Sequence, residues 1–357
     1  MTKVFQNFDL YPFYLKLAHA ACPSSDYRAI HQWLINDRFI ALHMLLPVIN
    51  GDSGFAVGGD EVSQRSWAQE KGMRNGEALD AILMAQIEDS GAEVFYNMDP
   101  LRFGSEIISS LPGCVKKAVA WRAAPSPNAD FGRYDLVVCN FESILQSYRD
   151  RGWNAAWFYP AFDPVMDDYA QVSRATDVVF VGSYSRHHQK RADVVEAISE
   201  LQSKYAIRIH LQLSRITKLA QTPLGFLPPL SRHRLPKRVA MVRAPAIFGR
   251  GLYDAFGTAK IVINGAIDMA GLDRGNMRCW EALGCGALML SDAGRYPDGM
   301  VPHKTIATYS STDDMVDQIN HYLQNEDCRL KIAQAGTEML KTRYSKSRQW
   351  SDFLALL

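Results

Sequence analysis

Arg278 and Glu281 stand three residues apart in a stretch whose pattern predicts a helix, so both side chains can face the same way. A guanidinium provides a fixed positive charge that suits a phosphate group. A carboxylate one helical turn away can accept hydrogen bonds from the two hydroxyls of a sugar diol. The pair therefore indicates a site for a ligand that carries both phosphate and sugar, although a carboxylate near a helix start is also favoured by the helix dipole alone.

The surrounding residues, 260–292, predict the elements that hold this pair. A β-branched apolar run at residues 261–263 ends at Asn264, and a polar loop follows. A helix is expected from Asn276 to Gly284 or Gly286, and a second apolar run comes directly after it. Strand, loop, helix and strand form the repeating unit of a parallel α/β sheet. Ligands of such sheets bind beyond the carboxyl ends of the strands, where helix N-termini favour anions.

An upstream segment is expected to join the same site. The pattern of residues 177–191 predicts a strand, a Gly182-Ser183 turn and a helix that begins in a basic cluster. This arrangement would bring Gly182, Ser183 and Arg186 near phosphates. A solvated helix face is an equally good interpretation of that cluster. The adjacent pair His187-His188 is a poor metal site, because neighbouring residues diverge on a helix or strand.

A general base would have to come from elsewhere in the chain. Asp99 has the best context, because it follows an apolar strand and precedes a proline. Other candidates are acidic or histidine side chains of the N-terminal half, and each can also be read as a cap or a surface group: Asp9, His43, Asp60 and Glu61.

Strand and helix patterns alternate along both halves, which predicts two doubly wound α/β domains. The glycine-rich residues 50–61 match no phosphate-loop spacing, and a tight connection around a short strand is the favoured interpretation. Residues 155–164 read as an interdomain connection. Residues 222–243, rich in Pro, Arg and His, read as an irregular surface excursion. A solvated loop is favoured there over contact with an anionic acceptor or a membrane.

Composition narrows the class of protein further. The formal net charge is +1, and no long basic run occurs, which argues against a dedicated nucleic-acid binder. The six cysteines form no CxxC pair, so zinc and disulfide readings are weak and a reducing compartment is expected. The N-terminus lacks the order of a signal peptide, and no apolar run approaches the ~20 residues of a membrane span. We expect a cytoplasmic protein, with weak attachment to the inner face of the membrane left open.

The C-terminal half resembles glycosyltransferases of the GT-B fold, in particular the CgeB-like and group 1 families. The residues that carry this resemblance are DVVFVGSYSRHHQKR at 177–191, IFGRGLYDAFGTAKIVIN at 247–264 and GNMRCWEALGCGALMLSD at 275–292. The spacing of Gly249, Tyr253, Lys260 and Asn264, and then of the residues from Asn276 to Gly286, is similar to that family's pattern. YDLVVCN at 134–140 and AFDP at 161–164 extend a looser resemblance into the N-terminal half.

The resemblance implies two Rossmann-like domains that face each other across a cleft. An acceptor would bind to residues 1–160, a nucleotide-sugar donor to residues 161–342, and a terminal helix, 343–357, would pack back on the first domain. The resemblance also implies that no metal or other cofactor is required. Donor contacts would come from Gly182, Ser183, Arg186, Gly249, Tyr253, Asn264, Asp268, Asp273, Asn276, Arg278 and Glu281.

Within that set, the resemblance implies two acidic residues separated by seven others. Glu281 fits the second position, and Asp273 stands at the first, where an aspartate shortens the reach; Asp268 is an alternative contact. Tyr253 could line the base pocket or simply pack.

The leading hypothesis is a transferase that moves a sugar from a nucleotide-sugar donor to a glycan, lipid-linked or other acceptor. A degenerate GT-B protein that acts as a binding or scaffold subunit is the alternative. A dinucleotide-dependent oxidoreductase or epimerase is disfavoured, because no strand runs into GxGxxG. The sequence leaves open the sugar, the nucleotide, the acceptor, the stereochemistry and the oligomeric state.

Overall fold

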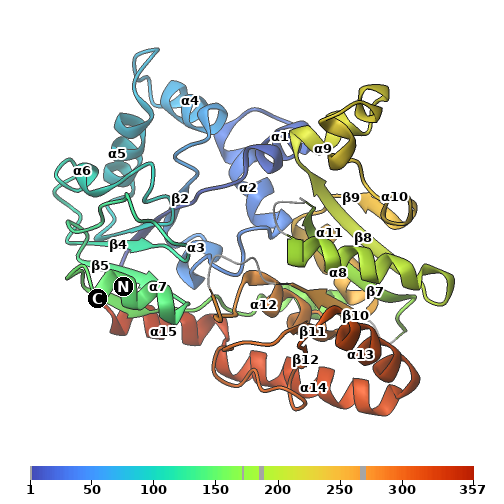
Figure 1. Cartoon of the computed structure of the whole chain (residues 1–357). Coiled ribbons are helices and arrows are strands. Elements are labelled where there is room, and N and C mark those ends of the chain that lie inside the picture. The colour runs from blue at the N-terminus through green and yellow to red at the C-terminus, as the bar shows by residue number, and fades with distance from the viewer. Residues whose placement is uncertain (1, 171–172, 185–188, 266–270) are drawn as a thin grey trace. The chain divides into compact units, whose positions relative to one another are not determined.

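Short parallel strands, buried on both faces, form the centre of two separate units in the computed structural model. Unit 1 comprises residues 1–161 with 346–357, and unit 2 comprises residues 162–345. Each unit contains one six-stranded sheet in which all strand pairs are parallel (Figure 1). The structure describes residues 2–170, 173–184, 189–265 and 271–357. The predicted fold class, α/β with two doubly wound sheets, is confirmed.

Unit 1 has the strand order β2-β1-β3-β4-β5-β6. Its strands are β1 (Val4–Asn7), β2 (Gly54–Ala56), β3 (Val94–Asn97), β4 (Lys117–Trp121), β5 (Leu136–Cys139) and β6 (Ala155–Trp157). Its helices are α1 (Pro12–Ala21), α2 (Tyr27–Asp37), α3 (Leu46–Ile49), α4 (Glu61–Glu70), α5 (Leu79–Ser90), α6 (Ser105–Ile108), α7 (Glu142–Arg149) and α15 (Lys346–Ala355).

Alternation along β3 shows why both faces of this sheet carry helices. Phe95 packs with Leu83 and Ile87 of α5 on one face. The next side chain, Tyr96, points the other way and lies against Phe353 of α15, with ring centroids 4.9 Å apart. Successive strand residues alternate between faces, so an unbroken apolar run requires a helical layer on each side.

Unit 2 has the strand order β12-β11-β10-β7-β8-β9. Its strands are β7 (Thr176–Tyr184), β8 (Ile207–Leu213), β9 (Arg243–Pro245), β10 (Ala259–Asn264), β11 (Leu288–Asp292) and β12 (Ala307–Tyr309). Its α-helices are α8 (Gln189–Glu200), α9 (Arg215–Ala220), α10 (Lys237–Val242), α11 (Gly249–Gly257), α12 (Met277–Gly284), α13 (Thr312–Gln324) and α14 (Glu326–Arg343). The described residues of this unit also form the 3₁₀ helices η1 (Pro164–Tyr169), η2 (Leu201–Ser203), η3 (Pro223–Phe226) and η4 (Leu230–His233).

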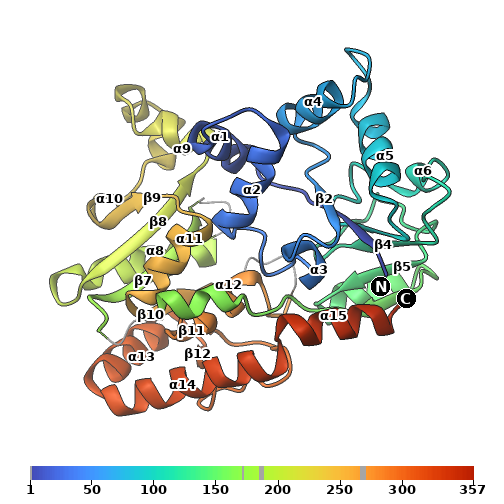
Figure 2. The same cartoon turned by 180° about the vertical axis from the view of Figure 1, so that it is seen from behind.

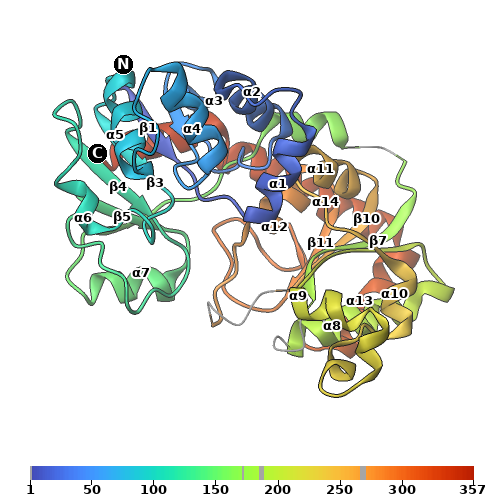
Figure 3. The same ribbon diagram turned by 90° about the horizontal axis from the view of Figure 1, so that it is seen from above.

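The chain of unit 2 winds in two directions from β7, which places its helices on opposite faces of the sheet. From β7 it moves through α8 to β8 and β9, and it then returns to β10 on the other side and continues to β11 and β12. Right-handed crossovers in opposite directions put the connecting helices on opposite faces. Figure 3 shows α8, α10 and α13 on one side of the strands and α11, α12 and α14 on the other, and Figure 2 shows the same elements from behind.

Several boundaries differ from the sequence prediction. The predicted turn at Gly182-Ser183 is wrong, because both residues still belong to β7 and pair with Leu211 and Gln212 of β8. The predicted connection at residues 155–164 begins with β6, which pairs with β5. The predicted excursion at residues 222–243 contains α10 and leads into β9. Strands of three residues at a sheet edge are too short to show a period of two in the sequence.

The last helix is attached to unit 1 by a buried amine. Lys346, 5% exposed, donates hydrogen bonds to the backbone oxygens of Ala41, Leu42 and Met44 and to the side chain of Gln349. Gln349 in turn donates to the backbone oxygens of Leu42 and Tyr159. These carbonyls follow α2 in a turn region. Leu42 also accepts the backbone N–H of Ala161, and the amine supplies a donor to the buried carbonyls of Ala41 and Met44.

We expect Lys346→Met to lower the free energy of unfolding by about 2–3 kcal/mol, because the apolar side chain keeps the volume but removes the donor that serves the buried carbonyls of Ala41 and Met44. Urea unfolding followed by circular dichroism measures this change. Lys16→Met, which removes a cation from an exposed position of α1 in the same unit, is the control and should leave the midpoint nearly unchanged. Equal midpoints for both variants would contradict the role of Lys346.

Candidate functional site

The carboxyl edge of the second sheet has its switch point between β7 and β10. These two strands are neighbours, and the chain leaves them toward opposite ends of the sheet. In an open α/β sheet this reversal creates a crevice beyond the strand ends, and ligands bind there. The helices α8, α11 and α12 run back along the sheet, so their N-termini lie at this same edge.

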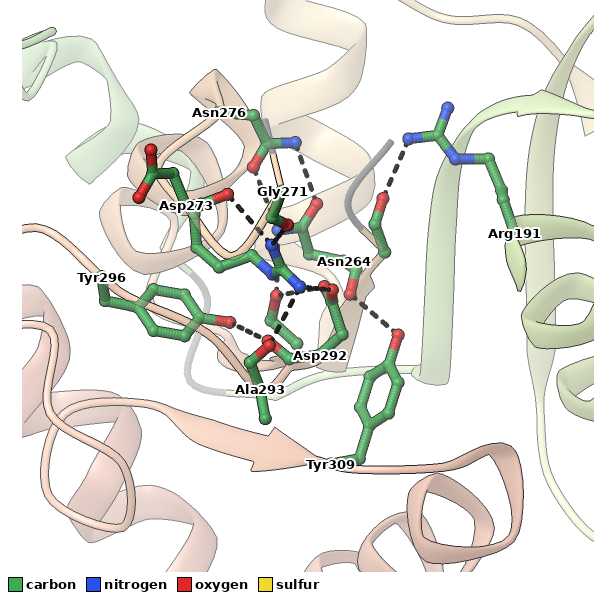
Figure 4. A network of polar contacts seen from close by, with 12 residues as sticks. Arg191, Asn264, Gly271, Asp273, Asn276, Asp292, Ala293, Tyr296 and Tyr309 are labelled. Atoms are coloured by element: carbon green, nitrogen blue, oxygen red, sulfur yellow. Dashed lines mark hydrogen bonds and ion pairs between the residues drawn. The ribbon is translucent and has the colours of Figure 1, made fainter. Parts of the chain in front are cut away.

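Asn264 is the centre of a polar network at that edge (Figure 4). Its side-chain amide donates to Asn276 Oδ1 at 3.0 Å and to Ser291 Oγ at 3.1 Å, and Asn276 Nδ2 donates back to Asn264 Oδ1 at 3.1 Å. Tyr309 donates to the Asn264 carbonyl at 3.2 Å. The network joins the ends of β10, β11 and β12 to the start of α12. The structure thus brings the predicted residues Asn264 and Asn276 together.

Asn276 occupies the position before the first turn of α12, but its side chain does not cap that helix. It is turned to Asn264 instead, as the two reciprocal hydrogen bonds show. The first N–H groups of a helix have no partner within the helix, and they carry partial positive charge. The start of α12 is therefore suited to receive an anionic group at the edge of the sheet.

Arg191 brings a cation to the switch point itself. It lies in the first turn of α8 and donates to Ser183 Oγ at the end of β7 at 3.2 Å. It also donates to the backbone oxygen of Gly265, directly after β10, at 2.9 Å. Figure 4 shows its guanidinium directed to this backbone from the α8 side. One side chain thus bridges the two strands between which the chain reverses.

Arg191 was not among the predicted donor contacts. Arg186 was predicted from the same basic cluster, but Arg186 lies outside the described residues. Ser183 is placed at this edge as predicted, and it is held by Arg191 rather than in a turn. Because residues 189–200 form α8, the distance of a basic residue from the helix start is the signal that would have selected Arg191.

The loop before α12 is held by an arginine that the prediction did not select. Arg274 donates to the backbone oxygens of Gly271 and Ala293, both at 2.9 Å, and pairs with Asp292 at 2.6 Å. Asp273, predicted as a sugar contact, is only 4% exposed and pairs with Arg295 at 2.7 Å. Its carboxylate is therefore engaged in fixing the loop. The alternative residue, Asp268, lies outside the described residues.

Arg278 and Glu281 contact each other, as their spacing predicts. They form an ion pair within α12, in which the Arg278 side chain is 22% exposed and that of Glu281 is 4% exposed. The pair neutralises the buried carboxylate, which would otherwise be costly. Arg278 lies in the first turn of α12 and keeps its partial exposure near the sheet edge.

We expect Arg278→Ala to lower the free energy of unfolding by about 2–3 kcal/mol, because it leaves the Glu281 carboxylate buried without its partner. The double variant Arg278→Ala/Glu281→Ala should recover part of this loss, with a coupling energy of about 1–2 kcal/mol in the cycle. Urea unfolding of wild type, both single variants and the double variant measures it. Strict additivity of the two single effects would show that the pair does not stabilise the fold.

Tyr253 and Gly249 belong to α11, and they lie at different depths. Gly249 is the first residue of the helix, so it lies near the carboxyl edge of the sheet. Its φ is positive, 52°. Tyr253 is 1% exposed and donates to Asp163 at 3.2 Å. Burial, with the negative charge of Asp163, raises the pKa of the Tyr253 phenol well above its usual value. Of the two interpretations of Tyr253, packing is what the structure shows. Gly182 likewise lies inside β7, where an added Cβ would lie 3.0 Å from the ring of Phe180.

The first sheet has its own switch point, between β1 and β3, and Asp99 lies just beyond it. Asn7 at the end of β1 donates to Asn97 at the end of β3 at 2.9 Å, and Asn97 accepts the backbone N–H of Asp99 at the same distance. Asp99 is 7% exposed and pairs with Arg102 at 3.2 Å. Burial, together with the negative charge of Asp9, raises the pKa of Asp99 to about 6.

Two of the other base candidates, Asp60 and His43, have structural contacts. Asp60 accepts the Ser63 N–H at the start of α4 and lies 3.0 Å from His19. His43 is buried against Trp121, and burial lowers its pKa to about 3. A pKa that is shifted toward neutrality by burial marks Asp99 as the strongest acid–base candidate of unit 1.

Within the described residues, no cluster of three or more His, Cys, Asp or Glu side chains could hold a metal ion. Among these same residues, no helix has both the length and the apolarity that crossing a membrane requires. Free cysteines number six, three of them buried.

The strand order of unit 2, read from its first strand, is 3-2-1-4-5-6, the order of a doubly wound nucleotide-binding sheet. The comparisons with known proteins agree with this class. Residues 226–355 match the family model described as glycosyl transferase-like. No curated protein sequence matches the chain.

Several known structures share the fold. Anabaena HepE in complex with UDP and glucose has a TM-score of 0.60 at 12% identity, with 99% of each chain covered. A glycosyltransferase from Rickettsia africae has a TM-score of 0.57 at 9% identity, with 99% of this chain and 97% of that chain covered. TarM from S. aureus has a TM-score of 0.52 at 13% identity; the match covers 78% of this chain and 58% of TarM.

At these identities the likeness of structure establishes the fold, and the family match adds the sequence class of the C-terminal residues. Together they confirm the predicted GT-B fold, and residues 226–355 are similar to the glycosyl transferase-like family.

Proposed function

We propose that the chain transfers a glycosyl group from a nucleoside diphosphate sugar to a hydroxyl of a glycan or lipid-linked acceptor. The donor would bind at the carboxyl edge of unit 2. The observation that carries this proposal is the switch point between β7 and β10, where Arg191 and the start of α12 present positive charge to one place. The family match and the nucleotide complexes of HepE support a donor of this class.

In this transfer the bond between the anomeric carbon and the diphosphate oxygen breaks, and a bond to the acceptor oxygen forms. Negative charge develops on the departing diphosphate, and a guanidinium and unpaired backbone N–H groups stabilise it. Among the residues that the structure describes, Arg191, Arg278 and the N-terminus of α12 supply such charge at the edge. We therefore propose that transfer needs no bound metal.

The acceptor hydroxyl loses its proton as the new bond forms. Asp99 is the group that we propose for this role, because its raised pKa of about 6 suits proton transfer near neutral pH. Its place beyond β3 puts it at the carboxyl edge of the first sheet, where a ligand of unit 1 would bind. The acceptor would accordingly bind to unit 1.

A panel of UDP-, GDP-, ADP-, dTDP- and CMP-sugars tests the function. Calorimetry should show binding of one nucleotide class, and release of free nucleotide should accompany it, with the same rate in the presence of EDTA. UDP-glucose is the first probe, because HepE is known in complex with it. Binding and hydrolysis that are absent across the whole panel would refute the proposal. Binding without any hydrolysis or transfer would favour a scaffold subunit instead.

A further inference from the structure

The positive charge of the chain is concentrated in one part of unit 2. No aspartate or glutamate occurs between Glu200 and Asp254, whereas ten lysine and arginine residues lie between them. The whole chain has a formal net charge of only +1, so the remainder is acidic on balance. Most of these cations are exposed, among them Arg215, Arg232 and Lys237. A local charge of this size attracts anionic partners.

The same part of unit 2 exposes large apolar side chains. They belong to residues 214–243, which we call the basic-apolar segment and which run from the start of α9 through η3 and η4 to the end of α10. Six of its large hydrophobic side chains are exposed: Ile216, Leu219, Leu224, Phe226, Leu227 and Met241. Phe226 is 72% exposed and Met241 67% exposed. Ile216 and Leu219 stand three residues apart on α9 and so share one face of it.

The fold holds these side chains outward. Arg234 donates to the backbone oxygens of Ala220 and Thr222 at 3.1 and 3.3 Å, and its guanidinium lies 4.0 Å from the centroid of the Phe226 ring. Gly225 packs so closely on the end of α9 that an added Cβ would lie 1.8 Å from the Ala220 oxygen.

Two side chains of the segment attach it to the hydrophobic core of unit 2. Leu235 and Val239 are buried in the core of unit 2. Figures 1 and 2 show α9 with its adjoining turns beyond the end of β8, away from α13 and α14. The exposed apolar groups are therefore fixed on a rigid support.

We propose that the basic-apolar segment docks on the surface of a lipid bilayer that contains anionic lipids. Its cations match the charge of anionic headgroups, and its exposed aliphatic and phenyl groups can enter the boundary of the acyl chains. Nucleic acid is the other large polyanion, but its binding would leave the aliphatic side chains in water. Proteins bind single strands by stacking the bases on aromatic residues, and of the six exposed apolar side chains in the segment only Phe226 is aromatic. The docking needs none of the groups assigned to sugar transfer and stands independently of that proposal.

Flotation of the full-length protein with vesicles of phosphatidylcholine and phosphatidylglycerol in equal parts tests the docking. We expect the protein to float with these vesicles and not with pure phosphatidylcholine. Phe226→Ser/Leu227→Ser should lower the partition coefficient at least about tenfold, because two apolar anchors are removed. Arg232→Ala/Lys237→Ala should lower it by a similar factor, since each basic residue contributes about fivefold near an anionic surface.

Leu330→Ser/Lys331→Ala is the matched control, because it removes one exposed leucine and one exposed cation from α14. This variant should float like the wild type. Thermal unfolding of all variants checks that each remains folded. The proposal is overturned by a wild type that does not float, by equal losses in the control, or by a Phe226→Ser/Leu227→Ser variant that floats normally. In the last case, retention of that variant on heparin would identify a general polyanion surface.

Discussion

Asp99→Asn is expected to lower kcat for transfer by about 10²–10⁴-fold, because the amide cannot take the proton of the acceptor hydroxyl. At the same time it should make the protein more stable at neutral pH. Few substitutions at buried carboxylates are expected to have opposite effects on activity and stability, so the combination separates a catalytic role from a merely structural one.

The direction of the stability effect follows from the pKa. The pKa of Asp99 is raised from 3.8 to about 6 in the folded protein, chiefly by burial. The folded state therefore holds this proton more tightly than the unfolded state, and ionisation costs stability as the pH rises from about 4 through about 6. Above that range the cost is about 3 kcal/mol at most. The asparagine variant avoids it and loses only the ion pair with the half-exposed Arg102, worth about 0–1 kcal/mol.

Urea unfolding at pH 5 and pH 8 measures the stability difference, and a pH profile of kcat/KM measures the catalytic role. The wild-type profile should rise with a midpoint near pH 6 and reach its plateau above that pH. Asp9→Asn is the matched variant: it removes the nearby charge that raises the pKa of Asp99, so the rise should move to lower pH while the plateau persists. A profile that is unchanged in Asp99→Asn would exclude Asp99 as the base.

Arg191→Ala should lower kcat/KM for the nucleotide-sugar by about 10²–10³-fold, because charge on the departing diphosphate loses a cation held in place at the switch point. The hydrogen bonds of Arg191 to Ser183 and to the Gly265 backbone keep its guanidinium oriented before a ligand arrives. Arg191→Lys should restore only part of the rate, since a lysine cannot bridge both acceptors with planar geometry.

Steady-state kinetics with UDP-glucose, or with whichever donor the panel identifies, measures this effect. Lys331→Ala removes an exposed cation from α14 of the same unit and is the control for a general loss of charge. A loss of similar size in both variants would show that Arg191 acts only through the overall field.

The sequence predicts the fold of this chain well, because its central strands are unbroken apolar runs and many of its helices carry a clear periodic pattern. The elements from β10 to β11 match the prediction closely, and Asn264 and Asn276, which were predicted separately as donor contacts, form hydrogen bonds with each other. The edge strands β6 and β9 escaped prediction, because three residues that pair on one side only carry little periodic signal.

The sequence predicts the location of the candidate site better than it predicts the contacts between its residues. The edge, the helix start and the proximity of Arg278 to Glu281 follow from spacing alone. The pairing of Asp273 with Arg295 does not, because Arg295 is 22 positions away along the chain and its approach depends on the tertiary fold. Arg191 was missed for a related reason: it is one of several cations within residues 186–191, and only the tertiary fold shows that its side chain reaches the end of β7.

A crystal structure of the protein soaked with UDP tests the central claim most directly. We predict that the diphosphate lies at the carboxyl edge of unit 2, within hydrogen-bonding distance of the Arg191 guanidinium and of the first backbone N–H groups of α12. A diphosphate bound at the carboxyl edge of unit 1, or a switch point between β7 and β10 that stays empty at saturating nucleotide, would contradict the account.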